Sequence, residues 1–342
     1  MLLEKLSNAA GISGYETEIR NIIRDELKPH VDKVYTDTIG NLFATKKGTE
    51  NNLKVMVAAH MDEVGFFIDS IDSKGFLKFK KIGGIDDRVL LSKRVMVGEK
   101  KSPGVIGLKP IHLKSSGDRG KVVKSDDMGI DVGASSKDDA KKTAKEGYTA
   151  IFATKFSQSG DIATGKAFDD RAGCAVLIEL LKGSYPFTLH GVFTVQEELG
   201  LRGAGVAAYA LNPDFAFALE GTTAGDMPTK RDVSPSTNMG GGPAITVMDR
   251  SVISDKRLVK LLVNTAEKEG IPYQFKRTVT GGTDSGAIHR ARSGVPSVTV
   301  AVPIRYIHSP VGMLNLKDFQ NTVKLMEKTL QRMPELEGSE RG

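Results

Sequence analysis

Long apolar runs alternate with amphipathic stretches over most of the chain, and this alternation predicts strands and helices in turn. The run at residues 53–59 has no polar alternation and ends at His60, which indicates a strand buried on both faces of a sheet. Further strands are expected at residues 33–35, 41–46, 189–195, 215–219 and 296–301. The same pattern places helices at 203–210, 255–269 and 316–333. A first helix is expected to run to about Leu27, because Ser13 and Glu16 have capping-box spacing. Strands alternating with helices are typical of the α/β class.

Residues 70–160 have a different texture. Short strand-like runs occur at 76–79, 95–97, 105–107 and 149–154, among many Gly, Lys and Asp residues, with one polar helix expected near 137–145. This stretch interrupts the alternating pattern, so it is expected to be an inserted β-rich module. The remaining residues, 1–69 and 161–342, would then form one discontinuous domain.

Composition and charge narrow the classes of protein. Lys and Arg number 48 against 42 Asp and Glu, giving a net charge of +6, but these residues are mixed and form no basic run. A solvated basic surface is therefore expected rather than a nucleic-acid site. The single Cys174 excludes an intramolecular disulfide and suits a reducing cytosol. No signal-peptide pattern and no apolar stretch near the ~20 residues of a membrane span is found, so we expect a soluble, cytoplasmic protein.

Acidic and imidazole side chains gather where the predicted strands end. They are His60 and Asp62, Glu197 and Glu198, Glu220, and His308, while Asp169 and Asp170 precede a helix on the same edge. Each residue alone has an ordinary explanation as a hydrogen-bonded or helix-capping group. Together they make a mixed nitrogen and oxygen set that suits Zn, Co or Mn. Structural zinc sites use Cys instead, so catalysis is the better inference.

Six segments in one order resemble a known family. They are AAHMDEVGF (58–66), KAFDDRAGC (166–174), TVQEELGLRGA (194–204), ALEGTTAGDMP (218–228), GGTDSGAIH (281–289) and PIRYIHSP (303–310). With them the chain resembles the peptidase family M42 aminopeptidases, which include glutamyl aminopeptidases and proteins once labelled endoglucanase M. The resemblance implies an α/β/α sandwich zinc-peptidase domain. It also implies that residues 70–160 form a small PDZ-like β-barrel that mediates dimerisation.

The resemblance further implies roles for the site residues. Asp169 would bridge two divalent ions, Zn or Co with Mn possible. His60 and Glu198 would complete one ion's ligands, and Glu220 and His308 the other's. Glu197 would be the general base and Asp62 would hold His60. Many members of the family have Asp at the position of Glu220.

The implied activity is removal of N-terminal residues from short peptides by metal-activated water, in dimers that join into a tetrahedral dodecamer. A related metal-dependent amidohydrolase or deacylase stays open as an alternative, as does a non-catalytic metal-binding scaffold. A glycosidase is disfavoured, because adjacent residues such as Glu197 and Glu198 on a strand point to opposite faces and flank a substrate poorly.

Four further expectations concern the surroundings of the site. Cys174 is expected to pack a helix, and Lys166 and Arg171 to form salt bridges at that helix's start. Asp284 is expected to cap a helix after the GGTDSG turn. The side-chain preference is left open: the loop 228–242 is expected to shape the pocket, and its Lys230 and Arg231 either favour acidic substrates or face solvent.

Overall fold

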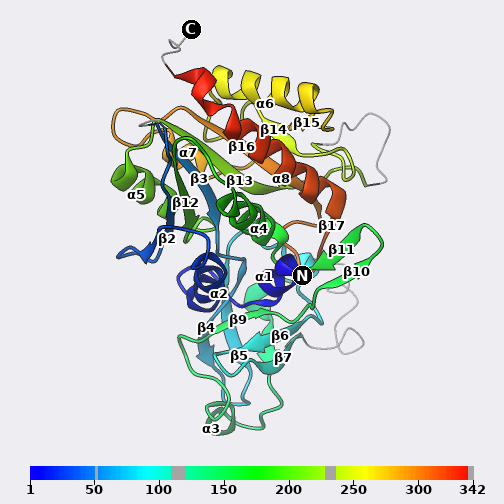
Figure 1. Cartoon of the computed structure of the whole chain (residues 1–342). Helices are drawn as coiled ribbons and strands as arrows, with labels where there is room; N and C mark the ends of the chain where they lie inside the picture. Colours follow the sequence, from blue (N-terminus) through cyan, green and yellow to red (C-terminus); the bar gives the residue numbers. More distant parts are fainter. Residues whose placement is uncertain (51–52, 109–120, 228–235, 338–342) are drawn as a thin grey trace.

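The protein consists of a large mixed sheet covered by helices and a separate closed barrel (Figure 1). This computed structural model describes residues 1–50, 53–108, 121–227 and 236–337. The sheet has the order β1-β2-β12-β3-β13-β16-β17-β11-β10, with β14 paired to β16 and β15 to β14. Its strands are β1 (Lys33–Thr36), β2 (Leu42–Lys46), β3 (Lys54–His60), β10 (Ser157–Ser159), β11 (Ile162–Gly165), β12 (Thr188–Thr194), β13 (Phe215–Thr223), β14 (Ala244–Thr246), β15 (Gln274–Phe275), β16 (Ser297–Arg305) and β17 (Gly312–Asn315).

The centre of the sheet is parallel, and this feature positions the site. β12, β3, β13 and β16 pair in parallel, in that order. Their carboxyl ends therefore lie at one edge of the sheet. The α/β class expected from the alternating apolar pattern is confirmed.

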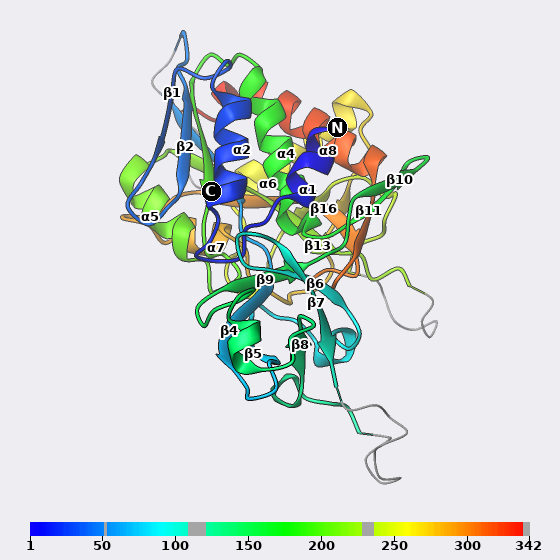
Figure 2. The same ribbon diagram turned by 90° about the horizontal axis from the view of Figure 1, so that it is seen from below.

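Helices cover both faces of this sheet. The larger layer contains α1 (Leu2–Asn8), α2 (Thr17–Leu27), α4 (Phe168–Lys182), α6 (Lys256–Glu269) and α8 (Leu316–Gln331), which Figure 2 shows together on one side. The smaller layer contains α5 (Arg202–Leu211) and α7 (Ser285–Ile288). Along β3, Val55 and Val57 face the first layer's core while Met56 and Ala58 face the second's, so this strand is buried on both faces as expected. No helix among the described residues is long and apolar enough to cross a membrane.

The barrel has its own core and contains the strands β4 (Gly65–Ile71), β5 (Leu77–Ile82), β6 (Arg94–Val97), β7 (Ser102–Gly107), β8 (Gly129–Asp131) and β9 (Thr149–Phe152). Phe66 packs edge-on against Phe79 and Phe152 inside it. Short helical turns lie at α3 (Lys137–Ala140), η1 (Asp87–Val89) and η4 (Ser125–Asp127), and a last one, η5 (Met333–Leu336), follows α8. Figures 1 and 2 show the barrel standing outside the sheet and its helices.

Several local expectations differ from the structure. The helix α1 was not expected, and the capping box is wrong, because the Ser13 hydroxyl donates to Asp62 Oδ2 at 2.6 Å instead of capping α2. The helix expected near 137–145 ends at Ala140. The first barrel strand begins at Gly65, ahead of residue 70, since β4 follows β3 after only a short polar segment and starts with apolar residues like those of β3. Treating residues 70–160 as a separate domain stays a prediction.

Candidate metal centre

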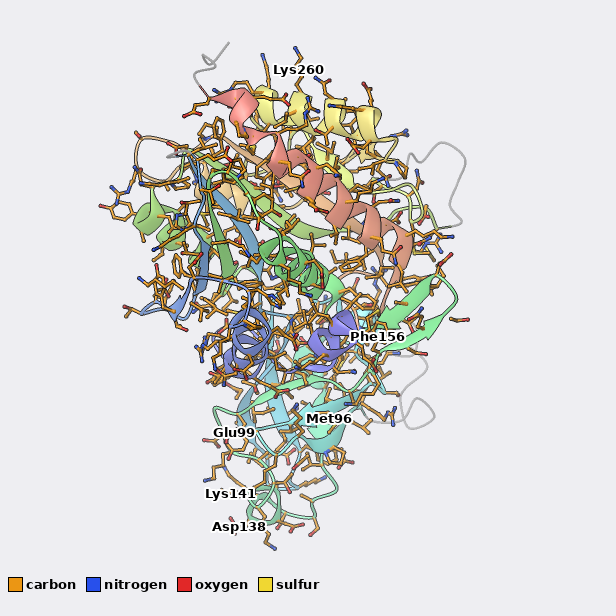
Figure 3. All side chains as sticks on the ribbon, in the orientation of Figure 1. Met96, Glu99, Asp138, Lys141, Phe156 and Lys260 are labelled. Atoms are coloured by element: carbon orange, nitrogen blue, oxygen red, sulfur yellow. The ribbon has the colours of Figure 1, made fainter. Side chains whose placement is uncertain are left out.

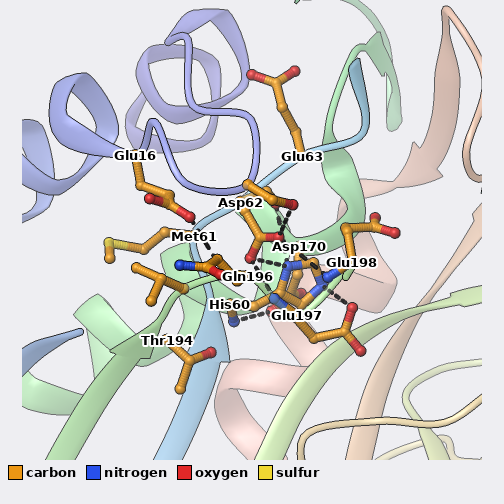
Figure 4. A network of polar contacts seen from close by, with 12 residues as sticks. Glu16, His60, Met61, Asp62, Glu63, Asp170, Thr194, Gln196, Glu197 and Glu198 are labelled. Atoms are coloured by element: carbon orange, nitrogen blue, oxygen red, sulfur yellow. Dashed lines mark hydrogen bonds and ion pairs between the residues drawn. The ribbon is translucent and has the colours of Figure 1, made fainter. Parts of the chain in front are cut away.

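The candidate site lies at the carboxyl edge of the parallel strands. His60 is the last residue of β3 and pairs with Thr194, the last residue of β12. Glu197 and Glu198 follow β12 in the chain, and Figure 4 shows both beside His60. Glu220 lies within β13, opposite Ala301 of β16. The parallel pairing therefore brings side chains from distant segments to one place.

Asp169 lies between the two histidines. His60 Nε2 is 3.2 Å from Asp169 Oδ1, and His308 Nε2 is 3.3 Å from Asp169 Oδ2. Each histidine also has a glutamate beside it: Glu220 Oε2 is 3.6 Å from His60 Nε2, and Glu198 Oε1 is 3.3 Å from His308 Nε2. A bridging carboxylate with one imidazole and one glutamate on each side is thus present. These distances place Glu220 beside His60 and Glu198 beside His308, while His60, Asp169 and Glu198 also bring ligand atoms within 4.8 Å of one another, so the grouping that the resemblance implied stays a prediction.

Two further aspartates hold His60 in place. His60 Nδ1 is 3.5 Å from Asp62 Oδ1 and 3.2 Å from the Asp62 carbonyl oxygen. The Asp62 carboxylate also accepts the backbone N–H groups of Glu197 at 3.0 Å and Glu198 at 3.1 Å, so it orients the acidic loop as well. Asp170 Oδ2 accepts the His60 backbone N–H at 3.2 Å. Both aspartates are fully buried, so the ring and backbone of His60 are fixed from two sides.

The barrel also reaches this site. The Gly84 carbonyl oxygen, in the loop after β5, is 3.3 Å from His308 Nδ1. A Cβ atom on Gly83 would come within 3.1 Å of Glu198 Oε2. The φ of Gly83 is +79°, which also favours glycine at this position. The barrel loop therefore restricts how His308 and Glu198 can move.

The electrostatics show crowded carboxyl groups. Burial raises the pKa of Glu197 and of Glu220 well above the usual range, and neighbouring carboxylates add to both shifts. Burial and the charge of Asp169 raise the pKa of Glu198 to about 7, although His308 opposes this. Burial tends to lower the pKa of His308, but the Asp169 hydrogen bond and Glu198 raise it to about 9. The raised pKa values show that the ionised glutamates repel one another in this buried place. A bound cation would offset that repulsion.

The donor set fits divalent cations. Three groups of side chains bring their ligand atoms within 4.8 Å of one another: His60 with Asp170 and Glu220, His60 with Asp169 and Glu198, and Glu197 with Glu220 and Asp284. Imidazole nitrogens mixed with carboxylate oxygens suit Zn, Co or Mn. The excess of buried carboxyl groups over cationic partners gives the physical reason for a cation at this edge.

Asp284 belongs to this cluster although the sequence did not assign it there. It stands at the N-terminus of α7, but its side chain makes no capping hydrogen bond, so the expected capping role is wrong. Its Oδ2 accepts the Thr194 hydroxyl at 2.5 Å, its backbone N–H donates to Glu220 Oε1 at 3.0 Å, and its Oδ1 has no partner among the described residues. A Gly-Gly-Thr-Asp turn before a helix has the same sequence whether the Asp caps the helix or faces a site, so no sequence signal separated the two.

The neighbouring expectations are confirmed where the structure describes them. Cys174 is fully buried in α4. Lys166 and Arg171 both form ion pairs with Glu63, at 2.8 and 3.2 Å. Lys230 and Arg231 lie outside the described residues.

A cavity of about 310 Å³ opens onto the cluster, and we call it the edge cavity. His60, Asp169, Glu197, Glu220 and His308 line one part of it. The rest of its lining comes mostly from β13, β14, β16 and the residues between β15 and α7, with Ser236 and Ile307 besides, and most of these residues carry hydroxyl groups. The volume lies at the lower end of the range for small-ligand pockets, ~300–1,000 Å³.

The fold and cluster together define an α/β protein whose candidate site lies at the carboxyl edge of its sheet. The M42 glutamyl aminopeptidase family matches residues 40–325. The chain therefore belongs to this family and is an aminopeptidase of the M42 type.

Individual relatives cover nearly the whole chain. A protein of Acetivibrio thermocellus is 41% identical over 96% of this chain and 97% of its own. A lysyl aminopeptidase of Pyrococcus furiosus is 34% identical, covering 97% and 96%, and a glutamyl aminopeptidase of Lactococcus lactis subsp. cremoris is 33% identical, covering 93% and 91%.

Solved structures share the fold. A TET aminopeptidase from a marine sediment archaeon, Thaumarchaeota archaeon SCGC AB-539-E09, superimposes with a TM-score of 0.93 at 39% identity, covering 97% of this chain and 95% of that one. A peptidase of Pyrococcus horikoshii that can assemble into a tetrahedron or a large octahedral shell gives a TM-score of 0.85 at 38% identity, covering 96% and 98%.

Proposed function

We propose that this aminopeptidase depends on two divalent cations, held by His60, Asp169, Glu198, Glu220 and His308. The observation that carries the proposal is the Asp169 carboxylate, whose two oxygens lie 3.2 and 3.3 Å from two different imidazole nitrogens. A carboxylate shared in this way is suited to bridging two ions. Zn or Co is preferred for the mixed donor set, and Mn is possible.

Bound cations would supply a water of lowered pKa and polarise the scissile carbonyl, as the aminopeptidase class illustrates. The chain's own residues would transfer the proton and position the groups that react. Glu197 lines the edge cavity with its Oε2 4.0 Å from His60 Nε2, so it is placed to take a proton from water and pass it to the leaving amine. Asp62 keeps Glu197 in position through the backbone N–H. The acidic end of the cavity attracts the free α-amino group of a peptide, which favours action at the N-terminus.

A substrate panel tests this proposal. Aminoacyl-p-nitroanilides are incubated with the protein and added Co²⁺, Zn²⁺ or Mn²⁺, and at least one should be hydrolysed. Glu197→Gln should retain the bound metal and lose about 10²–10⁴-fold in kcat. Hydrolysis of non-peptide amides alone would favour the amidohydrolase alternative, and metal binding with no hydrolysis would favour the non-catalytic scaffold.

We further propose that the barrel mediates dimerisation, with the PDZ-like character that the family resemblance implies, and that dimers join into a tetrahedral dodecamer. Support comes from the Pyrococcus horikoshii peptidase, which assembles into a tetrahedron or a larger shell. Size-exclusion chromatography with light scattering separates a dimer from a dodecamer.

A cytoplasmic location is also proposed, since the single Cys174 suits a reducing compartment, and cell fractionation tests it.

Family membership leaves the preferred N-terminal residue open. The two relatives with named preferences differ, one being a lysyl and the other a glutamyl aminopeptidase. The preference of this chain therefore depends on its own residues around the site and not on its family membership alone.

A further inference from the structure

Three consecutive backbone N–H groups after β12 donate to two buried carboxylates, and we call these residues, 196–198, the acidic loop. The Gln196 N–H donates to Glu16 Oε1 at 3.3 Å. The N–H groups of Glu197 and Glu198 donate to the two oxygens of Asp62 at 3.0 and 3.1 Å. Figure 4 shows Glu16 and Asp62 beside this loop. The path of the backbone that carries Glu197 is therefore set by side chains from outside the loop.

The acidic loop needs this support because its backbone turns unusually at Gln196. The φ of Gln196 is +55°, a left-handed conformation that residues other than glycine rarely adopt. A conformation of this kind persists only where the surrounding contacts hold it. Gln196 directly precedes Glu197 in the chain, so the direction in which the Glu197 side chain leaves the loop depends on those contacts.

Both carboxylates are in turn held by the short segment that precedes α2. The buried Ser13 hydroxyl donates to Asp62 Oδ2 at 2.6 Å. A hydrogen bond to an ionised carboxylate is roughly twice as strong as one between neutral groups, so this contact fixes the plane of the Asp62 carboxylate. The carboxylate of Glu16 is buried as well, and its Oε1 also accepts the Gly14 N–H at 2.7 Å. The segment therefore orients each of the two acceptors of the acidic loop.

This segment forms a tight turn that is fixed to the rest of the protein. The Tyr15 N–H donates to the Ile12 carbonyl oxygen at 2.8 Å, which closes the turn. Ile12 also forms a β-bridge with Glu63, the residue that follows Asp62 in the chain. The turn that carries Ser13 is thus tied to the backbone directly beside the carboxylate that Ser13 contacts.

We propose that Ser13 and Glu16 are positioning residues for the hydrolytic reaction, which hold the acidic loop so that Glu197 points at the water it deprotonates. The inference rests on the proposed role of Glu197 as the base. Neither Ser13 nor Glu16 lines the edge cavity, so both act through the loop and not on the substrate. A reacting group misplaced by about 1 Å can cost about 10²-fold in rate, which gives the loop contacts their importance.

Substitution of Ser13 separates the rate of reaction from substrate binding. With saturating Co²⁺ and the aminoacyl-p-nitroanilide that the enzyme hydrolyses best, Ser13→Ala should lower kcat about 10-fold and change KM by less than about 2-fold, because it displaces the base and not the walls of the cavity. Ser13→Thr keeps a hydroxyl and should recover most of kcat. Glu16→Ala should also lower kcat, and Glu16→Gln should recover most of it, because the amide oxygen still accepts the Gln196 N–H.

The matched control for Ser13→Ala is Ser297→Ala. Ser297 is also a buried serine, and its hydroxyl donates to the Val295 carbonyl oxygen at 2.9 Å. It begins β16, at the edge of the sheet opposite the site, so this variant should keep the wild-type kcat. For Glu16→Ala the control is Glu99→Ala, which removes an exposed glutamate of the barrel (Figure 3). An equal fall of kcat in Ser297→Ala would show general destabilisation and overturn the inference.

A double-mutant cycle shows whether Ser13 acts through Glu197. In Glu197→Gln the base is already absent, so adding Ser13→Ala should lower the residual kcat by less than about 2-fold. The full effect of Ser13→Ala in both backgrounds would show that Ser13 acts independently of Glu197, and this result overturns the inference.

Hydrogen–deuterium exchange followed by mass spectrometry gives a readout apart from activity. A peptide covering residues 195–199 should exchange faster in metal-supplemented Ser13→Ala than in the wild type, and Ser297→Ala should leave it unchanged. An unchanged kcat in Ser13→Ala overturns the inference alone, whatever the exchange shows, provided that Glu197→Gln is impaired. A wild-type kcat in Glu197→Gln would instead contradict the proposed function, and this inference with it.

Discussion

Two clusters of buried charge lie a few residues apart in this protein and differ in how their charges are partnered. The first, which we call the paired cluster, consists of Glu63, Lys166 and Arg171. Glu63 accepts from Lys166 Nζ at 2.8 Å with each oxygen, and Arg171 donates to it at 3.2 Å. The second is the candidate metal centre, where carboxyl groups meet mostly other carboxyl groups. Figure 4 shows the Glu63 carboxylate pointing away from the His60 network, although the residues are close in sequence.

The difference teaches how a buried charge can be classified. In the paired cluster, backbone carbonyls take up the remaining donors: Lys166 Nζ donates to the Ala9 oxygen, and Arg171 donates to the oxygens of Leu6 and Met61. In the metal centre the carboxyl groups hold raised pKa values, and Asp284 Oδ1 has no partner among the described residues. A buried cluster complete in itself indicates structure, and one that lacks cations indicates a site.

Breaking the paired cluster should have the largest effect on stability. Glu63→Gln keeps the shape of the side chain but leaves Lys166 and Arg171 buried without an anion. We expect the free energy of unfolding to fall by about 3–5 kcal/mol. Denaturant unfolding measures it, and Asp25→Asn is the control, because Asp25 forms an exposed pair with Lys28 that water screens and that is expected to contribute little. Equal effects of the two substitutions would remove the distinction drawn above.

At the candidate metal centre, added cations should change the free energy of unfolding more than substitution of a single carboxylate does. Zn²⁺ or Co²⁺ at a hundredfold excess over its Kd should raise the free energy of unfolding by about 2.7 kcal/mol, because it binds the folded state. A chelator should reverse the gain, and thermal unfolding follows both. Asp169→Asn should abolish the gain, because it removes the carboxylate whose two oxygens lie 3.2 and 3.3 Å from the two histidines. A metal-independent melting temperature in the wild type would contradict the proposed centre.

The paired cluster should also make the free energy of unfolding depend on pH, through Lys166. Burial lowers the pKa of Lys166 to about 8 from 10.5, against the opposing charge of Glu63. Between these pH values the unfolded chain binds the Lys166 proton and the folded protein does not. The contribution of this residue to the free energy of unfolding therefore rises with pH, by at most about 1.4 kcal/mol per unit. The difference between wild type and Lys166→Met should widen in favour of the wild type from pH 8 upwards, and a constant difference would show that the pKa is not lowered.

The sequence predicted the elements that have strong periodic patterns. The apolar run before His60 and the stripe of α6 are long enough to define a strand and a helix. It missed α1, which has only 7 residues, and it placed the start of the barrel too late because β4 follows β3 after only a short polar segment and resembles it in composition. Short or adjoining elements depend on tertiary packing, which a local pattern does not contain.

The residues of the candidate site also fall into some that the sequence predicted and some that it did not. Motifs and strand ends named His60, Asp169 and His308, and the structure brings them together, while their binding of metal stays a prediction. The distances from the glutamates to the histidines and the position of Asp284 could not be predicted, because they depend on the pairing of β3, β13 and β16.

The smallest expected effect tests whether a missing partner marks function outside the acidic cluster. Thr246 Oγ1 and Thr329 Oγ1 are both buried without a partner among the described residues, but Thr246 lines the edge cavity and Thr329 lies in α8. Substitution of either by Val should raise the free energy of unfolding by up to about 1 kcal/mol, because a desolvated hydroxyl is removed. Only Thr246→Val should also lower kcat/KM on the aminoacyl-p-nitroanilide that the enzyme hydrolyses best, a gain of stability against function that sites commonly show. If both variants keep the wild-type kcat/KM, a buried hydroxyl without a partner reflects packing in this protein. A missing partner then marks a functional site only where the buried group is charged.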